Sequence, residues 1–171
     1  KNGATDKKYF DKTFVPLFST DEALSLADGV YLPPVITNHA MNEVKIQLEK
    51  AKKLGILYTL VGNISQIQLS LDFGMTPYGD FRLNVTNGHT RDALMALGIK
   101  RLVLSPELTL PKARDIGGAV IVYGRIPLML TERCFIKENF GCEKCGKAAL
   151  SDRRGESFPI IREHGHRNLI L

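Results

Sequence analysis

The chain has 171 residues, of which 44% are hydrophobic and 24% are charged. This composition is average for globular proteins and excludes the fibrous and intrinsically disordered classes. The apolar runs are far shorter than the roughly 18 residues of a membrane span, so we expect no membrane-spanning segment and no membrane partner. The formal net charge of +5 is spread along the chain and does not by itself indicate a nucleic-acid partner.

Short apolar runs alternate with amphipathic helices through most of the chain. The predicted strands cover residues 30–36, 56–61, 81–86, 101–104 and 119–123. The predicted helices include residues 40–54, with Asn38 as N-cap, and residues 109–116; the two between them end at Gly74 and Gly98. This alternation predicts an α/β fold with parallel strands.

The strands favour a TIM-like (β/α) barrel over an open, doubly wound sheet. No G-x-G-x-x-G motif follows any of them, so the signature of a dinucleotide-binding sheet is missing. A closed barrel typically has eight β/α units. The shorter series in this chain therefore predicts a partial barrel.

The pattern divides the chain into three segments. We interpret residues 1–28 as the lead-in of a truncated barrel, residues 29–125 as β/α units, and residues 126–171 as a small irregular β appendage containing Cys and His. The chain begins Lys1-Asn2-Gly3, without an initiator Met, so we expect a fragment of a longer protein. Missing strands would expose a sheet edge, which predicts either a homodimer paired through that edge or a rearranged sheet.

Polar residues concentrate where the loops after the strands are expected, which is where parallel β/α folds carry their functional groups. Asn84 and Asn87 offer amides to a polar substrate, and Ser105 lies in a neighbouring loop. Glu107 is a candidate general acid or base, and Arg125 can hold a carboxylate in a bidentate fork. Asn87 and Ser105 also suit turn or cap roles, whereas Asn84 falls inside a predicted strand, where capping does not explain it.

All three cysteines lie between Cys134 and Cys145. Their odd number leaves no fully paired disulfide scheme, which favours a reduced, cytoplasmic compartment. Cys142 and Cys145 form a C-x-x-C pair whose thiolates can reach one metal, with His166 as a candidate fourth ligand. A Cys₃His zinc site, an iron–sulfur cluster and three free thiols are the alternatives. The chain has no H-E-x-x-H, G-x-S-x-G or Walker motif.

Several stretches together resemble a known family. Residues 123–134 (YGRIPLMLTERC), 141–145 (GCEKC) and 150–159 (LSDRRGESFP) resemble the collagenase-like peptidases, family thirty-two of the peptidases of unknown catalytic type. Residues 80–87 (DFRLNVTN) and 104–108 (LSPEL) are similar to barrel strands of the same family. The resemblance covers most of residues 29–171.

The resemblance implies a bacterial, cytoplasmic, TIM-barrel-like protein. Some members take part in oxygen-independent hydroxylation of RNA bases or quinone precursors, and some bind a [4Fe–4S] cluster through four cysteines. Others carry only the label of collagen-degrading protease. By position, Cys134, Cys142 and Cys145 correspond to cluster ligands, and His166 falls near the fourth cysteine of the family, which leaves zinc or a Cys₃His cluster open.

We therefore expect part of a metal-dependent or iron–sulfur-dependent modifying enzyme that acts on an RNA base or a small aromatic compound. The alternatives are a peptidase acting on peptides, as the family label says, and a zinc-clasped, non-catalytic binding domain. Because barrel strands are expected to be missing, we expect no activity from this piece alone.

Overall fold

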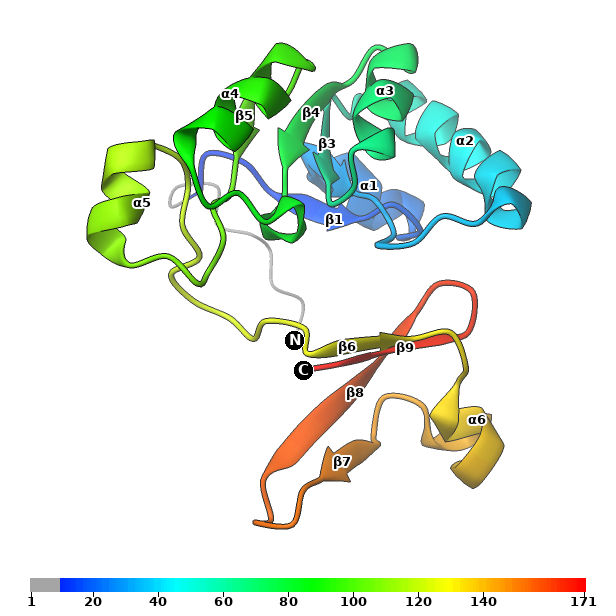
Figure 1. Ribbon diagram of the computed structural model, residues 1–171. Coiled ribbons are helices and arrows are strands. Elements are labelled where there is room, and N and C mark those ends of the chain that lie inside the picture. Colours follow the sequence, from blue (N-terminus) through cyan, green and yellow to red (C-terminus); the bar gives the residue numbers. More distant parts are fainter. Residues whose placement is uncertain (1–9) are drawn as a thin grey trace. The chain divides into compact units, whose positions relative to one another are not determined.

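A computed structural model describes residues 10–171 of the chain. Two compact units follow one another in the sequence, the first ending at Ile121 and the second covering Val122–Leu171 (Figure 1). Each unit has its own sheet and its own hydrophobic core.

The first unit is a five-stranded parallel sheet that alternates with helices, which confirms the predicted α/β class. Its strands are β1 (Phe14–Pro16), β2 (Gly29–Tyr31), β3 (Tyr58–Val61), β4 (Thr76–Gly79) and β5 (Arg101–Leu102). Its helices are α1 (Asp21–Leu26), α2 (Asn38–Lys53), α3 (Ser65–Asp72), α4 (Gly88–Ala96) and α5 (Leu110–Ile116), with a 3₁₀ turn, η1 (Phe81–Leu83), after β4. The strands lie side by side in chain order.

Helix α2 buries the apolar face that its sequence pattern predicts. Val44, Leu48 and Ala51 are fully buried, and they share one face because residues three and four apart are neighbours on a helix. The expected N-cap at Asn38 is wrong by one residue. Thr37 is the cap, because its hydroxyl accepts a hydrogen bond of 3.4 Å from the Ala40 N–H.

The two faces of the sheet differ in what covers them. Thr59 and Val61 of β3 are buried, and the Thr59 hydroxyl donates to Ser70 of α3 across 2.8 Å, so this face packs against helices. The opposite face carries half-buried aromatic rings, with the ring centroids of Tyr58 and Tyr78 lying 5.2 Å apart. The Lys12 ammonium lies 3.8 Å from the Tyr58 ring centroid, and its hydrogen bond with Tyr58 raises the pKa of Lys12.

Two predicted strands differ from the structure. Residues 81–86 are no strand, because Asp80 caps the 3₁₀ turn η1 by accepting from the Phe81 N–H across 2.8 Å. The strand of this β/α repeat lies earlier, at β4. Pro77 and Gly79 are unfavourable in strands, so the sequence does not indicate a strand there. The predicted strand 119–123 is reduced to Ala119, which forms an isolated parallel bridge with Val103. In addition, β1 and α1 lie where no element was predicted.

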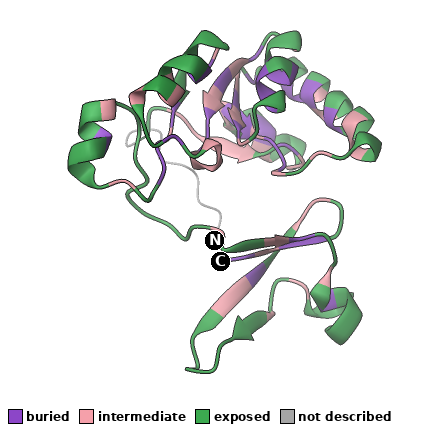
Figure 2. Cartoon of the chain, in the orientation of Figure 1, coloured by how far each residue is buried: buried purple, intermediate pink, exposed green. Residues whose placement is uncertain are grey.

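The second unit is a regular antiparallel sheet, whereas an irregular appendage was expected. Its strands are β6 (Met129–Thr131), β7 (Ala149–Ser151), β8 (Ser157–Glu163) and β9 (Arg167–Ile170), in the spatial order β6-β9-β8-β7. Between β6 and β7 lie helix α6 (Phe135–Phe140) and the 3₁₀ turn η2 (Cys142–Lys144). Its buried apolar core is limited to Ile136, Ile160 and Ile170 (Figure 2).

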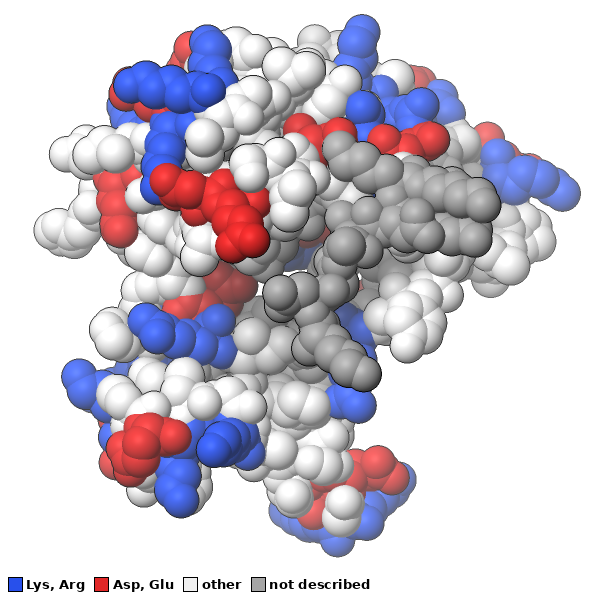
Figure 3. Space-filling view, turned by 180° about the vertical axis from the view of Figure 1, so that it is seen from behind, with Lys and Arg blue, Asp and Glu red and all other residues white. Residues whose placement is uncertain are grey.

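The surface carries charges of both signs. On the face shown in Figure 3, basic and acidic side chains of the described residues are interspersed, in agreement with a net charge spread along the sequence. Within residues 10–171, no helix is both long enough and apolar enough to cross a membrane.

Candidate functional site

The loops after β3 and β4 meet at the carboxyl edge of the parallel sheet. Asp80 directly follows β4, and its nearly buried carboxylate forms an ion pair with Nε of Arg82 in η1. The Arg82 guanidinium lies against Gly62, the residue that follows β3, and a Cβ at Gly62 would stand only 2.8 Å from Nε of Arg82. A fixed arginine, with one edge held by an acid, therefore occupies this edge of the sheet.

Gln66 joins the loops after β2 and β3. Its side chain is buried, donating to the Pro33 carbonyl across 2.8 Å and accepting from the Gly62 N–H across 2.9 Å. Beside it lies a small pocket, lined in part by Val35, Ile36, Met41, Asn63, Ser65 and Leu69. The pocket combines the polar groups of Gln66 and Asn63 with apolar side chains. This combination suits a small, partly polar ligand.

Asn84 and Asn87 have defined roles in the backbone of the loop after β4. Asn84 ends η1 with a left-handed φ of 50° and is exposed, so its predicted position inside a strand is wrong. Asn87 is the N-cap of α4, and its side-chain oxygen accepts from the Thr90 N–H across 2.9 Å. Both residues therefore lie at the carboxyl edge of the sheet, as expected for substrate contacts, although Asn87 already has a capping role.

Ser105 and Glu107 lie together in the loop after β5. Ser105 is buried, and its hydroxyl accepts a long hydrogen bond of 3.4 Å from the Glu107 N–H, while the Glu107 side chain is exposed. Arg125 belongs to the second unit and is exposed, in the segment before β6. The proposed acid or base and the proposed carboxylate-binding arginine thus come from different units.

The cysteines surround the short helix of the second unit. Cys134 is the N-cap of α6, and its Sγ accepts from the Lys137 N–H across 3.4 Å. Cys142 begins η2 and is exposed, whereas Cys145 ends it, donating its N–H to the Cys142 carbonyl across 3.1 Å. Cys134 and Cys145 are half-buried and pack against the same small core.

These thiols suit a soft metal or a cluster by their chemistry. The buried Asn168 donates from Nδ2 to Sγ of Cys134 across 3.7 Å. The Oδ1 atom of Asn168 is also buried, and it has no hydrogen-bond partner among the described residues. His166 is exposed in the turn between β8 and β9, with a φ of 60°. In residues 10–171, no three His, Cys, Asp or Glu side chains are grouped as metal ligands.

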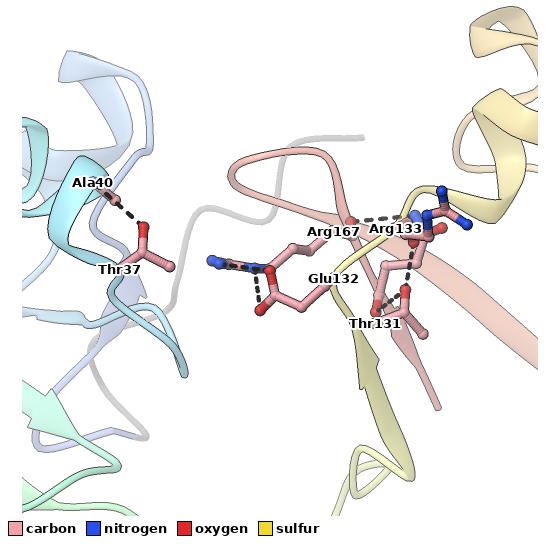
Figure 4. A network of polar contacts seen from close by, with 7 residues as sticks. Thr37, Ala40, Thr131, Glu132, Arg133 and Arg167 are labelled. Atoms are coloured by element: carbon pink, nitrogen blue, oxygen red, sulfur yellow. Dashed lines mark hydrogen bonds and ion pairs between the residues drawn. The ribbon is translucent and has the colours of Figure 1, made fainter.

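A bidentate ion pair ties together the strands beside the cysteines. Arg167, at the start of β9, donates through Nε and Nη2 to the two carboxylate oxygens of Glu132, each at 3.0 Å (Figure 4). Thr131 donates its hydroxyl to the Arg133 carbonyl across 2.7 Å. Together these bonds fix the backbone that leads from β6 into Cys134.

Our reading of the sequence missed Asp80, Arg82 and Gln66 as members of the site. Asp80 and Arg82 have a local signal, since a D-x-R pattern follows a glycine in the loop between a strand and the next helix. The strand was predicted too late in the chain, at residues 81–86, so Arg82 was assigned to the strand and the pattern was not recognised as a loop. Gln66 lacks such a signal, because its contacts with Pro33 depend on residues distant in sequence.

Comparisons of the chain with family models, curated proteins and solved structures found no match.

Proposed function

We propose that the chain is part of a metal-dependent modifying enzyme of the collagenase-like peptidase family. In this proposal the first unit belongs to a TIM-like barrel that binds an RNA base or a small aromatic substrate at its carboxyl edge. Cys134, Cys142 and Cys145 hold a [4Fe–4S] cluster or a zinc ion, with His166 or an outside group as fourth ligand. The family resemblance, the strand order and the small cysteine-bearing unit support this proposal.

The strand order supports the barrel. The five strands follow one another in the sheet without reversal, and all are parallel. Right-handed crossovers between successive neighbours place every helix on the same face, whereas a doubly wound sheet reverses its order and has helices on both faces. The aromatic rings of Phe14 and Tyr78, with centroids 5.9 Å apart, lie on the face opposite to the helices, where a barrel packs its interior side chains.

The observation that carries the metal proposal is the size of the second core. The unit Val122–Leu171 buries only three apolar side chains, all isoleucines, and two of its three cysteines pack against them. Units of this size seldom bury enough apolar surface for stability, and many are held by disulfides or a metal. Since three thiols cannot all pair with one another, a metal is the better explanation.

In this proposal the cysteines bind the metal, and residues of the first unit contact the substrate. Cys134 and Cys145 present sulfur from the edge of the small core, and Cys142 presents it from the exposed turn. When bound, an iron–sulfur cluster supplies electron transfer, whereas a zinc ion at this site stabilises the fold. In this proposal Asn84 contacts a polar substrate and Glu107 exchanges a proton with it; both residues lie in loops that follow strands of the parallel sheet.

The experiment is metal analysis of the chain purified without oxygen, followed by reconstitution with iron and sulfide. We expect bound iron with visible charge-transfer absorbance, or one tightly held zinc, and loss of either in Cys134→Ser and Cys145→Ser. Lys144→Gln changes a neighbouring residue of the same turn without removing a thiol, so it should retain the metal. A metal-free chain with intact thiols would overturn the proposal, and metal-independent peptide hydrolysis would favour a peptidase.

The predicted homodimer remains part of this proposal. Among the described residues, β1 pairs only with β2, so it is an edge strand of the parallel sheet. An unpaired edge favours association with a second chain. Light scattering that gives a mass of twice 19.0 kDa would support the dimer, and a mass of 19.0 kDa at high concentration would contradict it.

A further inference from the structure

We propose that Arg82 forms a binding site for a small oxyanion, the phosphate or carboxylate group of a small-molecule ligand, at the carboxyl edge of the parallel sheet. This inference concerns the first unit alone and does not depend on the cysteines or on a bound metal. It goes beyond the substrate residues expected from the sequence, none of which is Arg82.

The guanidinium is held in a fixed orientation. Asp80 accepts from its Nε, and the Asp80 side chain is only 8% exposed, so the carboxylate that positions it is itself fixed. Asp80 is held in turn by the Phe81 N–H, which donates to its other oxygen across 2.8 Å. An arginine held on its Nε edge keeps its two terminal nitrogens free to act as a pair.

The terminal nitrogens are available for a ligand. The Arg82 side chain is 27% exposed, and within the described residues its hydrogen bond is the one from Nε to Asp80. The guanidinium lies against Gly62, and its Cζ is 6.0 Å from the Phe81 ring centroid. A cation restrained by backbone, ring and carboxylate loses little conformational freedom when it binds.

The geometry of the guanidinium sets the class of ligand. Two parallel N–H donors match the two oxygens of a carboxylate or a phosphate, and such paired, charge-assisted bonds are among the stronger polar contacts in proteins. Gln66 accepts from the N–H of Gly62, the residue against which Arg82 lies, and Gln66 also lines a pocket with a mixed polar and apolar lining. A ligand with an anionic group and a small, partly polar body therefore suits this edge of the sheet.

The test measures binding of inorganic phosphate and of malonate to the full 171-residue chain, by calorimetry and by the shift of Arg82 side-chain NMR signals. We expect Arg82→Gln to weaken binding by about tenfold or more. The matched control is Arg114→Gln, because Arg114 also pairs with a neighbouring aspartate but is 78% exposed, and it should bind as the wild type does.

A second pair of variants separates a positioned guanidinium from net charge. Gly62→Ala places a Cβ 3.1 Å from Cζ of Arg82, which displaces the guanidinium while the charge stays the same. We expect it to weaken binding, whereas Gly88→Ala, whose Cβ would meet no atom within 4 Å, should not. Melting curves show that each variant is folded before its affinity is compared.

The outcomes decide whether Arg82 forms an anion-binding site. Tighter binding of phosphate than of malonate indicates a phosphate ester as ligand, and the reverse order indicates a carboxylate; either supports the proposal when it depends on Arg82 and Gly62. No shift of the Arg82 signals with either anion at millimolar concentration overturns it. Equal weakening in Arg82→Gln and Arg114→Gln also overturns it, because binding would then follow net charge alone.

Discussion

Asn168 donates from its side-chain Nδ2 to the Sγ of Cys134 across 3.7 Å, and this contact connects strand β9 to the N-cap of α6. The same sulfur accepts from the Lys137 N–H across 3.4 Å. N–H groups directed at a sulfur fix its orientation, as outer-shell donors do around bound metals. Asn168 is fully buried, so it holds Cys134 from inside the small core.

Asn168→Ala should lower the affinity of the second unit for zinc or for a cluster by about 10- to 100-fold, because Cys134 loses a donor that orients it. Competition with a zinc chelator of known affinity measures this change. Asn139→Ala is the matched control, since Asn139 lies on the surface and donates to the Phe135 carbonyl of its own helix. Equal affinities of the two variants would contradict the role of Asn168.

Removal of the metal should unfold the second unit and leave the first intact. Among the described residues, the second core has three buried isoleucines, whereas the first has eighteen buried apolar residues. A ligand present at a thousand times its dissociation constant contributes about 4 kcal/mol to stability, which is a large share of what a small unit has. Hydrogen exchange should show protection lost in β8 and β9 after chelation, with β2 and β3 unchanged; loss in both units together would argue against a metal-dependent second unit.

The sequence predicted most helices and missed several of the short elements. Helix α2 was predicted within two residues at its start because its buried residues Val44, Leu48 and Ala51 recur at helical spacing. Strand β1 has only three residues, so no alternation is long enough to identify it. Arg82 was assigned to a strand because its apolar neighbours form a β-like run, yet Asp80, directly before that run, caps a 3₁₀ turn there. The contact between Asn168 and Cys134 joins residues far apart in sequence, and no local pattern encodes it.

Ser70→Ala should destabilise the first unit by about 1–3 kcal/mol, because it removes the buried acceptor of the Thr59 hydroxyl. Ser70 also donates to the Gln66 carbonyl across 2.7 Å, so the three groups form one chain of hydrogen bonds. The double variant Thr59→Val with Ser70→Ala removes both hydroxyls and should lose less than the single change. Urea unfolding measures both, and an additive loss in the double variant would refute the coupling.

Asn84→Ala should cost about 1 kcal/mol of stability, because alanine lacks the short polar side chain that lets asparagine tolerate the left-handed φ of 50° that Asn84 adopts. Asn84→Gly should cost nothing, since glycine adopts this conformation freely. The pair also tests the substrate role of the amide. If Asn84 contacts the substrate, Asn84→Gly weakens substrate binding in a folded chain, whereas unchanged binding would leave Asn84 with a backbone role alone.

Leu48→Ala should destabilise the first unit by about 2–5 kcal/mol, because Leu48 is fully buried between α2 and the sheet and its truncation leaves a cavity. The matched control on the same helix is Ile46→Ala, whose side chain is 63% exposed and whose loss should change stability by less than about 0.5 kcal/mol. Thermal unfolding followed by circular dichroism measures both changes. Because Leu48 lies in the first core and not in the second, its truncation should leave the unfolding of the second unit unchanged, as seen in hydrogen exchange of β8 and β9. A matching loss of protection there would show that the two units unfold together.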